Sequence, residues 1–312
     1  MRVNLAIFAH RTNNAMLVTE TLQNMTPSPA DCVRPAPLRV AVVGCGRVVD
    51  DVIADALTQR GMEVSAVRCS ADGAAEGIVD LFDIDALRNA IAKHDAVVST
   101  IADMSFRRRD RERAWRTNVD GVKALCLAIE AEGIGRLVHL GSILNLGRQT
   151  TSAPVDIDTP YLSDDDRTVL EVSLFRSEME AWKAAERGAK VTTICAGWIT
   201  DEICPIIGNF AEHGGRALPP MCSAFATAND VAMSVAEALT DGSTAGERII
   251  CASRNAALID IAREAFPDVT LTELSARRVK MLLHLPSPIA SKWLFEPAMG
   301  KLLYAQDKYV TR

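Results

Sequence analysis

The stretch that decides the fold is Leu38-Arg39-Val40-Ala41-Val42-Val43-Gly44-Cys45-Gly46. It begins with a valine-rich apolar run that only Arg39 interrupts, and the run ends at two glycines separated by one residue. A helical pattern follows as far as Gly61. A short apolar run that passes through a glycine turn into a helix predicts the first strand, turn and helix of a dinucleotide-type fold.

The same alternation of apolar runs and helical patterns continues along the chain. Further strands are predicted at residues 63–68, 96–100, 136–140 and 191–196, and helices at residues 85–93, 111–133 and 169–187. Strands that alternate with helices predict an α/β fold, in which a doubly wound parallel sheet is covered by helices on both faces.

The regular alternation ends near residue 197, and this sets the predicted domains. Helical patterns at residues 229–239 and 256–265 flank a short strand at residues 248–251, which suits a smaller lobe that covers a substrate. We predict an N-terminal extension, a Rossmann-like domain and a substrate-binding lobe, at residues 1–36, 37–200 and 201–312 respectively.

The composition of the 312 residues limits the classes of partner. The net charge is −6, so no basic surface is expected to attract nucleic acid or anionic lipid. The eight cysteines form no C-x-x-C pair, which predicts reduced thiols and a cytoplasmic protein. No histidine has a partner at ligand spacing either, so we predict no metal site. No apolar run reaches the ~18 residues of a membrane span. The expected partner is a small-molecule substrate, and a homodimer is left open.

Separated landmarks across residues 38–265 resemble the extended short-chain dehydrogenase/reductases, the NAD-dependent epimerase/dehydratase-like enzymes. The branch that they resemble most contains dihydroflavonol reductases and hopanoid-associated sugar epimerases. The landmarks are Thr117-Asn118-Val119-Asp120-Gly121, His139-Leu140-Gly141-Ser142-Ile143, Asp158-Thr159-Pro160, Gly197-Trp198-Ile199, Ala217-Leu218-Pro219-Pro220 and Asn229-Asp230-Val231-Ala232.

The resemblance implies a Tyr-x-x-x-Lys dyad on the helix at residues 169–187, and this sequence lacks it. In the family the phenol acts as general acid or base, and the ammonium lowers its pKa. Leu174 stands at the tyrosine position and Glu178 at the lysine position. Leucine cannot transfer a proton, and a carboxylate would disfavour a phenolate. The sequence therefore predicts that hydride chemistry by the family's mechanism is lost.

The glycine turn departs from the family pattern as well. The family's G-x-x-G-x-x-G corresponds here to Gly44, Arg47 and Asp50, with Gly46 displaced by one position. Asp50 and Asp51 place negative charge in the first helical turn, where it would repel a phosphate. Arg47 is the residue that could compensate, because a guanidinium binds phosphate well. The turn either retains dinucleotide binding or is purely structural.

Further positions bear on the cofactor. Arg68, at the end of the second strand, would meet a 2′-phosphate and favour NADP, or it is a solvated strand-end arginine. Asp80 and Leu81 match the Asp-Leu pair that the resemblance places at the adenine edge. Ile101 is bulkier than the family's alanine on the path of the ribose. We therefore predict no bound cofactor, with NADP or NAD as the cofactor if the turn does bind a nucleotide.

Two residues are the candidates for chemistry. Ser142 stands at the position of the family's catalytic serine or threonine, or it caps the loop after the strand. Glu178 is expected to face that serine, and burial beside Leu174 would raise its pKa and make it a general acid or base. The alternative is a solvated glutamate, or one paired with Arg176 or Lys183.

The residues expected to line a substrate pocket are Asp103, Met104, Tyr161, Leu174 and Trp198. Our leading hypothesis is an enzyme that acts on a small, apolar biosynthetic intermediate without net hydride transfer, by cyclisation, elimination or isomerisation. The alternatives are an NAD(P)-dependent reductase or epimerase with a non-standard proton donor, and a non-catalytic ligand sensor or partner subunit.

Overall fold

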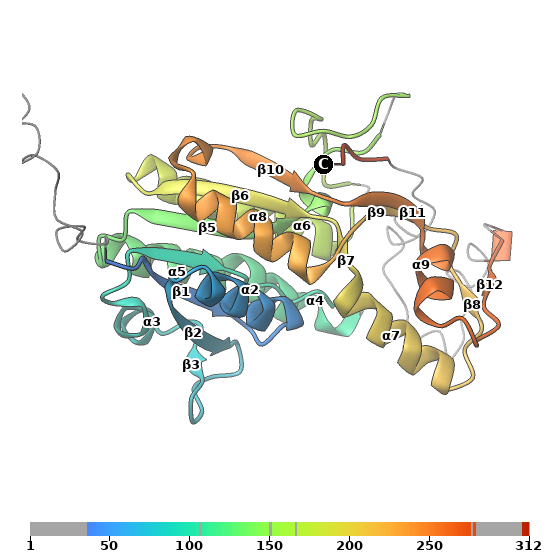
Figure 1. The fold of residues 1–312 in the computed structure, drawn as a ribbon, viewed down its shortest axis with the longest axis horizontal. Coiled ribbons are helices and arrows are strands. Elements are labelled where there is room, and N and C mark those ends of the chain that lie inside the picture. The colour runs from blue at the N-terminus through green and yellow to red at the C-terminus, as the bar shows by residue number, and fades with distance from the viewer. Residues whose placement is uncertain are drawn as a thin grey trace, which may run out of the picture. The chain divides into compact units, whose positions relative to one another are not determined.

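The computed structural model describes residues 36–105, 108–149, 152–165, 167–275, 277–278 and 308–311 (Figure 1). Leu38–Arg312 forms one compact unit. The predicted N-terminal extension lies, apart from residue 36, outside the described residues, as does the part of the predicted lobe at residues 279–307. Among the described helices, none is both long enough and apolar enough to cross a membrane.

A parallel sheet of seven strands forms the centre of the fold, and it confirms the predicted class. The strand order is β10-β6-β5-β4-β1-β2-β3, and every neighbouring pair is parallel. In that order the strands are Arg248–Cys251, Lys190–Ala196, Arg136–Ser142, Ala96–Ser99, Arg39–Gly44, Glu63–Ser70 and Val79–Asp80. Since the strands are parallel, their carboxyl ends share one edge, where ligands bind in open α/β sheets.

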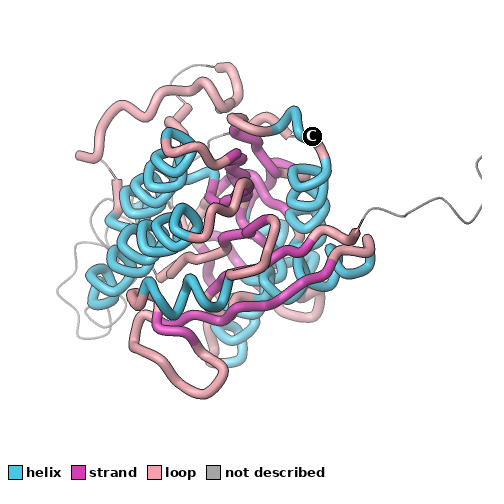
Figure 2. Tube along the Cα trace, turned by 90° about the vertical axis from the view of Figure 1, so that its left-hand side faces the viewer, coloured by secondary structure: helices cyan, strands magenta, loops and turns pink. Residues whose placement is uncertain are grey.

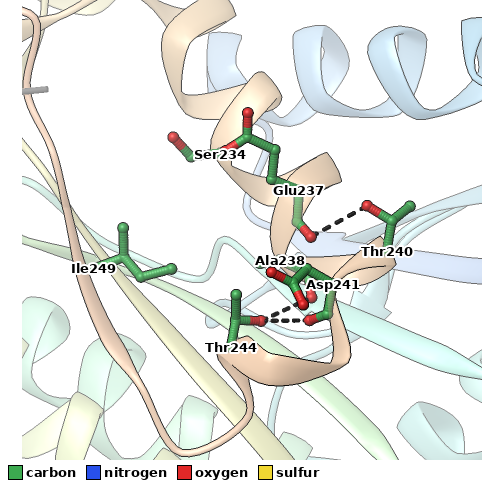
Figure 3. Close-up of a pocket in the computed structure, with 7 residues that line it drawn as sticks. All are labelled: Ser234, Glu237, Ala238, Thr240, Asp241, Thr244 and Ile249. Atoms are coloured by element: carbon green, nitrogen blue, oxygen red, sulfur yellow. Dashed lines mark hydrogen bonds between the residues drawn. The ribbon is translucent and has the colours of Figure 1, made fainter. Parts of the chain in front are cut away.

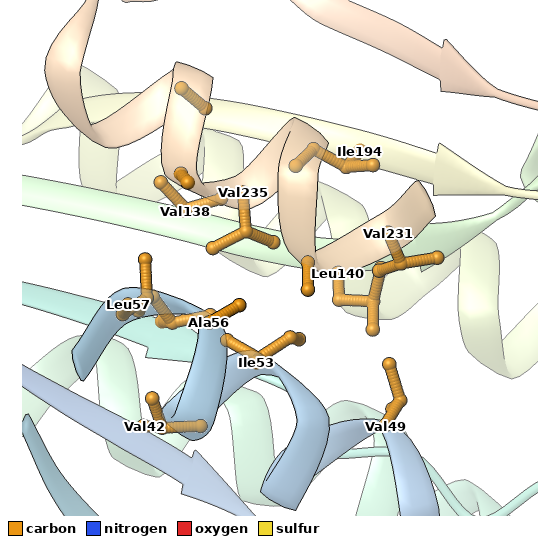
Figure 4. Packing of buried hydrophobic residues seen from close by; sticks show 14 of the residues in the cluster. Val42, Val49, Ile53, Ala56, Leu57, Val138, Leu140, Ile194, Val231 and Val235 are labelled. Carbon is orange, nitrogen blue, oxygen red and sulfur yellow. The ribbon is translucent and has the colours of Figure 1, made fainter. Parts of the chain in front are cut away.

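Helices cover both faces of this sheet (Figure 2). On one face α2 (Val48–Gln59) and α8 (Ala228–Thr240) pack against each other and against Val40 and Val42 of β1 (Figure 4). On the other face α3 (Ile84–Ile91), α5 (Val122–Ala131) and α6 (Val169–Glu186) pack against Ala41 and Val43. Both faces of β1 are therefore buried, which is why its sequence is a continuous apolar run.

The helix predicted at residues 111–133 runs without a break to residue 131 but contains a π-helical segment. It begins as α4 (Arg111–Trp115), after the short η1 (Arg108–Asp110), and widens into one π-helical segment, η2 (Arg116–Gly121), before α5. Gly121 is required there, because a Cβ atom would overlap the buried side chain of Leu81. Short π-helical segments are frequent at functional sites.

The C-terminal part of the chain forms two small sheets and two helices outside the main sheet. Beside the main sheet lie a three-stranded sheet, β11-β9-β7, a two-stranded sheet, β12-β8, and the helices α7 and α9. Their bounds are Arg254–Ala257, Cys222–Ala226, Trp198–Ile199, Thr272–Glu273, Ala217–Leu218, Thr200–Glu212 and Leu258–Ala265 respectively.

The helix and the strand expected in the lobe at residues 229–239 and 248–251 lie elsewhere. They are α8, which covers one face of the main sheet, and β10, which pairs with β6 as a strand of that sheet. The short η4 (Gly242–Thr244) connects α8 to β10. The physical reason is burial, because Ile249, Ile250 and Cys251 extend the apolar surface of the sheet beyond β6.

Candidate functional site

The turn between β1 and α2 holds the carboxylate of Asp50. Its Oδ2 accepts hydrogen bonds from the backbone N–H groups of Gly46 and Arg47, each at 2.9 Å. Gly46 has a φ of 82°, a left-handed conformation that glycine adopts without strain. Arg47 is the N-cap residue of α2, and Asp50 in the first turn of the helix accepts from it in a capping box. Backbone N–H groups at a helix N-terminus also bind anions readily. Here the anion comes from the chain itself.

Gly44 makes room for that carboxylate. A Cβ atom at position 44 would overlap the carboxylate of Asp50 and the hydroxyl of Thr100, which follows β4. Burial raises the pKa of Asp50, while hydrogen bonds from Thr100 and from the backbone of Arg47 and Gly46 partly offset the rise. The turn therefore has the backbone geometry that an anionic group needs, and a carboxylate uses it.

Arg47, the expected phosphate partner, forms an ion pair with Glu202 of α7. Its Nε and Nη2 donate to the two carboxylate oxygens at 3.1 and 2.7 Å, and both side chains are largely buried. Glu202 was not a candidate in the sequence, because 155 residues separate it from Arg47 and it belongs to no motif. The pair joins the β1–α2 turn to α7 of the small lobe.

Asp51 differs from its neighbour Asp50. It points away from the turn and pairs with Arg68 at 3.3 Å, and both side chains are mostly exposed. Arg68 is the register partner of Gly44, so it lies beside the turn as the sequence predicts. Of the two acids that were expected to oppose a phosphate, only Asp50 occupies the N–H groups.

The two residues expected at the adenine edge have structural contacts. Oδ1 of Asp80 accepts a hydrogen bond from the backbone N–H of Phe82 at 2.8 Å. Leu81 is fully buried against Gly121 of η2. Ile101, expected on the path of the ribose, is buried in the cluster between the sheet and α3, α5 and α6. These contacts fix the end of β3 and the segment after β4 relative to the turn.

Three of the predicted pocket residues come together in one apolar cluster at the carboxyl edge of the sheet. Leu174 is buried with Ala102 and Leu144, and Met104 and Trp198 pack against this group. The segments after β4, β5 and β6 thus meet around the position that the resemblance assigns to a tyrosine.

Ser142 lies at the end of β5 and is 9% exposed. Its Oγ accepts a hydrogen bond from the backbone N–H of Leu144 at 3.2 Å and so caps η3 (Ile143–Asn145). This is the capping geometry that the sequence offered as the alternative. It engages a lone pair of the hydroxyl and leaves the O–H as a donor.

Glu178 is fully buried, and four side chains donate hydrogen bonds to it. Its Oε1 accepts from Arg248 of β10 at 2.7 Å, and its Oε2 accepts from Asn145 of η3 at 3.0 Å. Thr193 of β6 and Trp182 of α6 also donate to Oε1, at 2.9 and 3.1 Å. The carboxylate therefore links α6 to β6, β10 and the loop that Ser142 caps.

The partners expected for Glu178 bind elsewhere. Arg176 pairs with Asp164, and Lys183 pairs with Glu180. His139 lies near Glu178 and is buried, and burial lowers the pKa of this imidazole to about 4, against the opposing effect of the Glu178 charge. At neutral pH the imidazole is therefore uncharged. The catalytic role of Glu178 stays a prediction, and its geometry is that of a buried ion pair.

Asp103 is held away from the apolar cluster. Its carboxylate pairs with Arg113 at 2.8 Å, and its backbone N–H donates to Oδ1 of Asn118 at 2.7 Å. Asn118, in η2, is fully buried and also donates to Ser173, one residue before Leu174. In the sequence Asn118 is part of the landmark Thr117-Asn118-Val119-Asp120-Gly121, but nothing there assigns it a role. Its amide connects the end of β4 to α6.

Tyr161 lies over α6 and stacks on Phe175, the residue after Leu174, with ring centroids 3.9 Å apart. The guanidinium of Arg167 lies 4.4 Å from the centroid of the tyrosine ring. Arg167 also donates to the backbone oxygens of Leu144 and Leu146, so the loop that carries Tyr161 is tied to the loop after Ser142. Burial raises the pKa of Tyr161, and the nearby carboxylate of Asp164 raises it further. The phenol is protonated at neutral pH.

A small cavity of about 240 Å³ lies apart from these residues, between α8 and β10 (Figure 3). Its lining includes Ser234, Asp241 and Ile249, and it contains none of the predicted site residues.

Comparison with known proteins places the fold among nucleotide-dependent enzymes. Residues 40–232 match the sequence model of a family described as the NAD dependent epimerase/dehydratase family. No match was found among curated proteins. The solved structure described as gox2253 is 20% identical, with a TM-score of 0.71 over 87% of this chain and 89% of that one.

Two further similar structures contain NAD. The UDP-glucose 4-epimerase of Thermus thermophilus is 16% identical, with a TM-score of 0.62 over 86% of this chain and 97% of that one. DesIV, the dTDP-glucose 4,6-dehydratase of Streptomyces venezuelae, is 16% identical, with a TM-score of 0.64 over 76% of this chain and 84% of that one. At these identities the likeness shows a shared fold.

The expectation of a protein without a cofactor is wrong, because the matched family is NAD dependent. The physical reason for the error lies in the turn. The charge of Asp50 opposes a phosphate, but the sequence does not show that backbone N–H groups of the turn bind this carboxylate and so retain an anion-binding geometry.

Proposed function

Because the chain belongs to the NAD dependent epimerase/dehydratase family, we propose that it is an NAD(P)-dependent enzyme of the epimerase, dehydratase or reductase type with a non-standard proton donor. Epimerisation and loss of water leave a substrate at its original oxidation level. The expectation of no net hydride transfer is therefore compatible with a bound cofactor. This reading replaces our leading hypothesis of a cofactor-free enzyme.

The observation that carries the proposal is the anion-binding turn. The backbone N–H groups of Gly46 and Arg47 hold a carboxylate at 2.9 Å, and the same groups would hold the pyrophosphate of a dinucleotide. Asp80 and Leu81 would lie at its adenine edge, and Arg68 beside its ribose. When bound, the cofactor supplies reversible hydride transfer at a substrate carbon.

Ser142 and the apolar cluster around Leu174 position the substrate in this proposal. The O–H of Ser142 donates to a substrate oxygen, while its lone pair keeps the bond from Leu144. Leu174, Met104 and Trp198 exclude water from the reacting carbon, and they favour a small substrate with an apolar face.

Tyr161 is the proposed proton donor. It stacks on Phe175, next to the position where the resemblance implies a tyrosine, and its raised pKa keeps the phenol in the protonated form that a proton donor needs. A neutral phenol keeps its proton at neutral pH until a substrate oxygen accumulates negative charge. Tyr161 lies on the loop before α6 and would have to direct its hydroxyl toward Ser142 to act as the donor, and this location in the sequence gives no family signal.

One observation favours a second candidate, a ligand-binding protein without turnover. Position 178, where the resemblance implies a lysine, carries a carboxylate that is paired with Arg248. The side chain at position 178 then carries a negative charge, which cannot lower the pKa of a neighbouring acid or base as a lysine would. Such a protein would bind the cofactor but would not convert a substrate.

Calorimetric titration with NAD⁺ and NADP⁺ tests the proposed function first. We expect saturable binding of one of the two. Turnover assays with UDP-glucose, dTDP-glucose and small hydroxy or keto compounds follow, and conversion of any of them separates the enzyme from the second candidate. Absence of binding of both nucleotides would contradict the proposal.

A further inference from the structure

The carboxylate of Asp50 lies in the turn between β1 and α2, which we call the phosphate turn, and is surrounded there on three sides. Two backbone N–H groups, of Gly46 and Arg47, donate to its Oδ2. Thr100, after β4, borders it on the side where Gly44 lacks a Cβ atom. The guanidinium of Arg47 is directed to Glu202 instead. The arrangement is that of an anion in a binding site, in which the anion is part of the chain.

Two anions cannot share these donors. If the proposed function is correct, the pyrophosphate of the cofactor needs the N–H groups that Asp50 now uses, and the two negative groups would lie within hydrogen-bond distance of each other. We propose that the Asp50 carboxylate is a displaceable occupant of the phosphate turn, which leaves the N–H groups or takes up a proton when the cofactor binds. The inference names a residue that sets the cofactor affinity and its dependence on pH.

The charged and titratable groups around Asp50 determine the sign of that dependence. Arg47 is the N-cap residue of the same helix. Glu202 of α7 forms an ion pair with Arg47 and so lies on the far side of this guanidinium from Asp50. Burial raises the pKa of Cys45 in the turn to about 11, and that of Cys69 at the end of β2 to about 12, so both thiols are neutral. Asp50 is therefore the buried acidic group of the turn, whereas Asp51 in the same helical turn is exposed and Asp103 acts on Cys45 from the segment after β4.

Protonation of Asp50 removes the like charge from the path of the phosphate. Its pKa is raised in the free protein, chiefly by burial, and an adjacent phosphate would raise it further. The affinity for NAD⁺ should therefore increase as the pH falls toward that pKa, and binding should be coupled to proton uptake.

Asp50→Ala and Asp51→Ala form a matched pair of variants. Each removes one carboxylate from the first turn of α2, but Asp51 is exposed and pairs with Arg68 outside the turn. We expect Asp50→Ala to bind NAD⁺ at least about tenfold more tightly than the wild type at neutral pH. Asp51→Ala should bind NAD⁺ within about threefold of the wild type, because its charge is screened by solvent and NAD⁺ has no 2′-phosphate for the released Arg68 to bind.

Asp50→Asn separates the effect of the negative charge from that of a side chain that occupies the N–H groups of Gly46 and Arg47. Its side-chain oxygen can still accept from Gly46 and Arg47, so the helix keeps its N-terminal hydrogen bonds while the charge is lost. We expect an NAD⁺ affinity that no longer changes between about pH 5 and 8. If Asp50→Ala fails to fold, as judged by circular dichroism and thermal melting, the pH profile of Asp50→Asn decides the question.

The outcomes distinguish the inference from the proposed function. If the wild type and both Asp50 variants bind NAD⁺ with equal affinity and equal pH profiles, the inference is wrong and the proposed function stands. An equal gain in Asp51→Ala would also overturn the inference, because general charge repulsion would explain it. If no variant and not the wild type binds NAD⁺ or NADP⁺, the proposed function is wrong, and the inference with it.

Discussion

Two acidic residues, Asp50 in the β1–α2 turn and Glu178 on α6, stand where the related enzymes are expected to have a glycine and a lysine. They differ in what binds them. Backbone N–H groups hold Asp50, whereas the side chains of Arg248, Asn145 and others hold Glu178. Backbone donors stay in place when an anion leaves, so a ligand can replace the first carboxylate. The second cannot leave without removing the partner of the partly buried Arg248 and of several hydrogen-bond donors.

The comparison shows that a departure from a family motif has two kinds of consequence. At Asp50 the scaffold of the site is retained, and an internal group occupies it. At Glu178 the charge that the family implies is reversed and built into the packing between α6, β6 and β10. Cofactor binding is therefore expected to survive, while proton transfer is expected to come from elsewhere.

The largest expected effect is a loss of stability in Glu178→Gln. Removing one member of a buried ion pair typically costs ~3–5 kcal/mol, and the partial exposure of Arg248 favours the lower end, about 3 kcal/mol. Urea unfolding measures the difference. Glu180→Gln, two residues along the same helix and paired with the exposed Lys183, should cost less than about 1 kcal/mol.

The same variant tests the role that the sequence suggested for Glu178. A general acid or base would lose turnover while the melting temperature stays unchanged. If Glu178→Gln and Glu180→Gln have equal, small effects on stability, Glu178 is not the structural ion pair described above.

The second effect concerns the proton donor. Tyr161→Phe should reduce turnover by at least about 100-fold, because general acid catalysis contributes about that much or more. Tyr309→Phe is the control, since Tyr309 is buried in a different cluster with Val155 and Ile250. Cofactor affinity should be unchanged in both variants. Full turnover in Tyr161→Phe would move the donor to another residue.

The smallest expected effect is on the stability of Asp50→Ala. Loss of a group that caps a helix N-terminus costs ~0.5–2 kcal/mol. The pKa of Asp50 is raised in the folded state, so the folded protein binds more protons than the unfolded chain just above the ordinary aspartate range. The contribution of Asp50 is therefore most favourable at low pH, and it falls as the pH rises through the raised pKa.

Unfolding curves of the wild type and Asp50→Ala at several pH values measure that cost. The difference between the two proteins should shrink as the pH rises. A difference that grows with pH would show that the pKa of Asp50 is lowered rather than raised in the folded protein.

The sequence predicted the sheet well, because strands buried on both faces are continuous apolar runs, as in Val40 to Val43. The sequence did not predict features that leave the spacing of the apolar residues unchanged. The π-helical segment at residues 116–121 has the amphipathic pattern of an ordinary helix, and a short strand such as β10 carries no mark of the sheet to which it belongs.

The site was harder to predict for a related reason. The acids at positions 50 and 51 are equivalent in the sequence, and only the fold directs one into the turn and the other to Arg68. The partners of Glu178 are distant in the chain, with Arg248 70 residues away. A motif fixes which residue stands at a position, but its role depends on donors that other elements bring to it.

The most direct test of the account is the number of protons taken up when NAD⁺ binds. Calorimetric titrations in buffers with different ionisation enthalpies give this number for the wild type and for Asp50→Ala. We predict that the wild type takes up a fraction of a proton per NAD⁺ at mildly acidic pH, and that Asp50→Ala takes up none. Equal proton uptake by the two proteins, or binding of neither NAD⁺ nor NADP⁺ by either of them, would contradict the account.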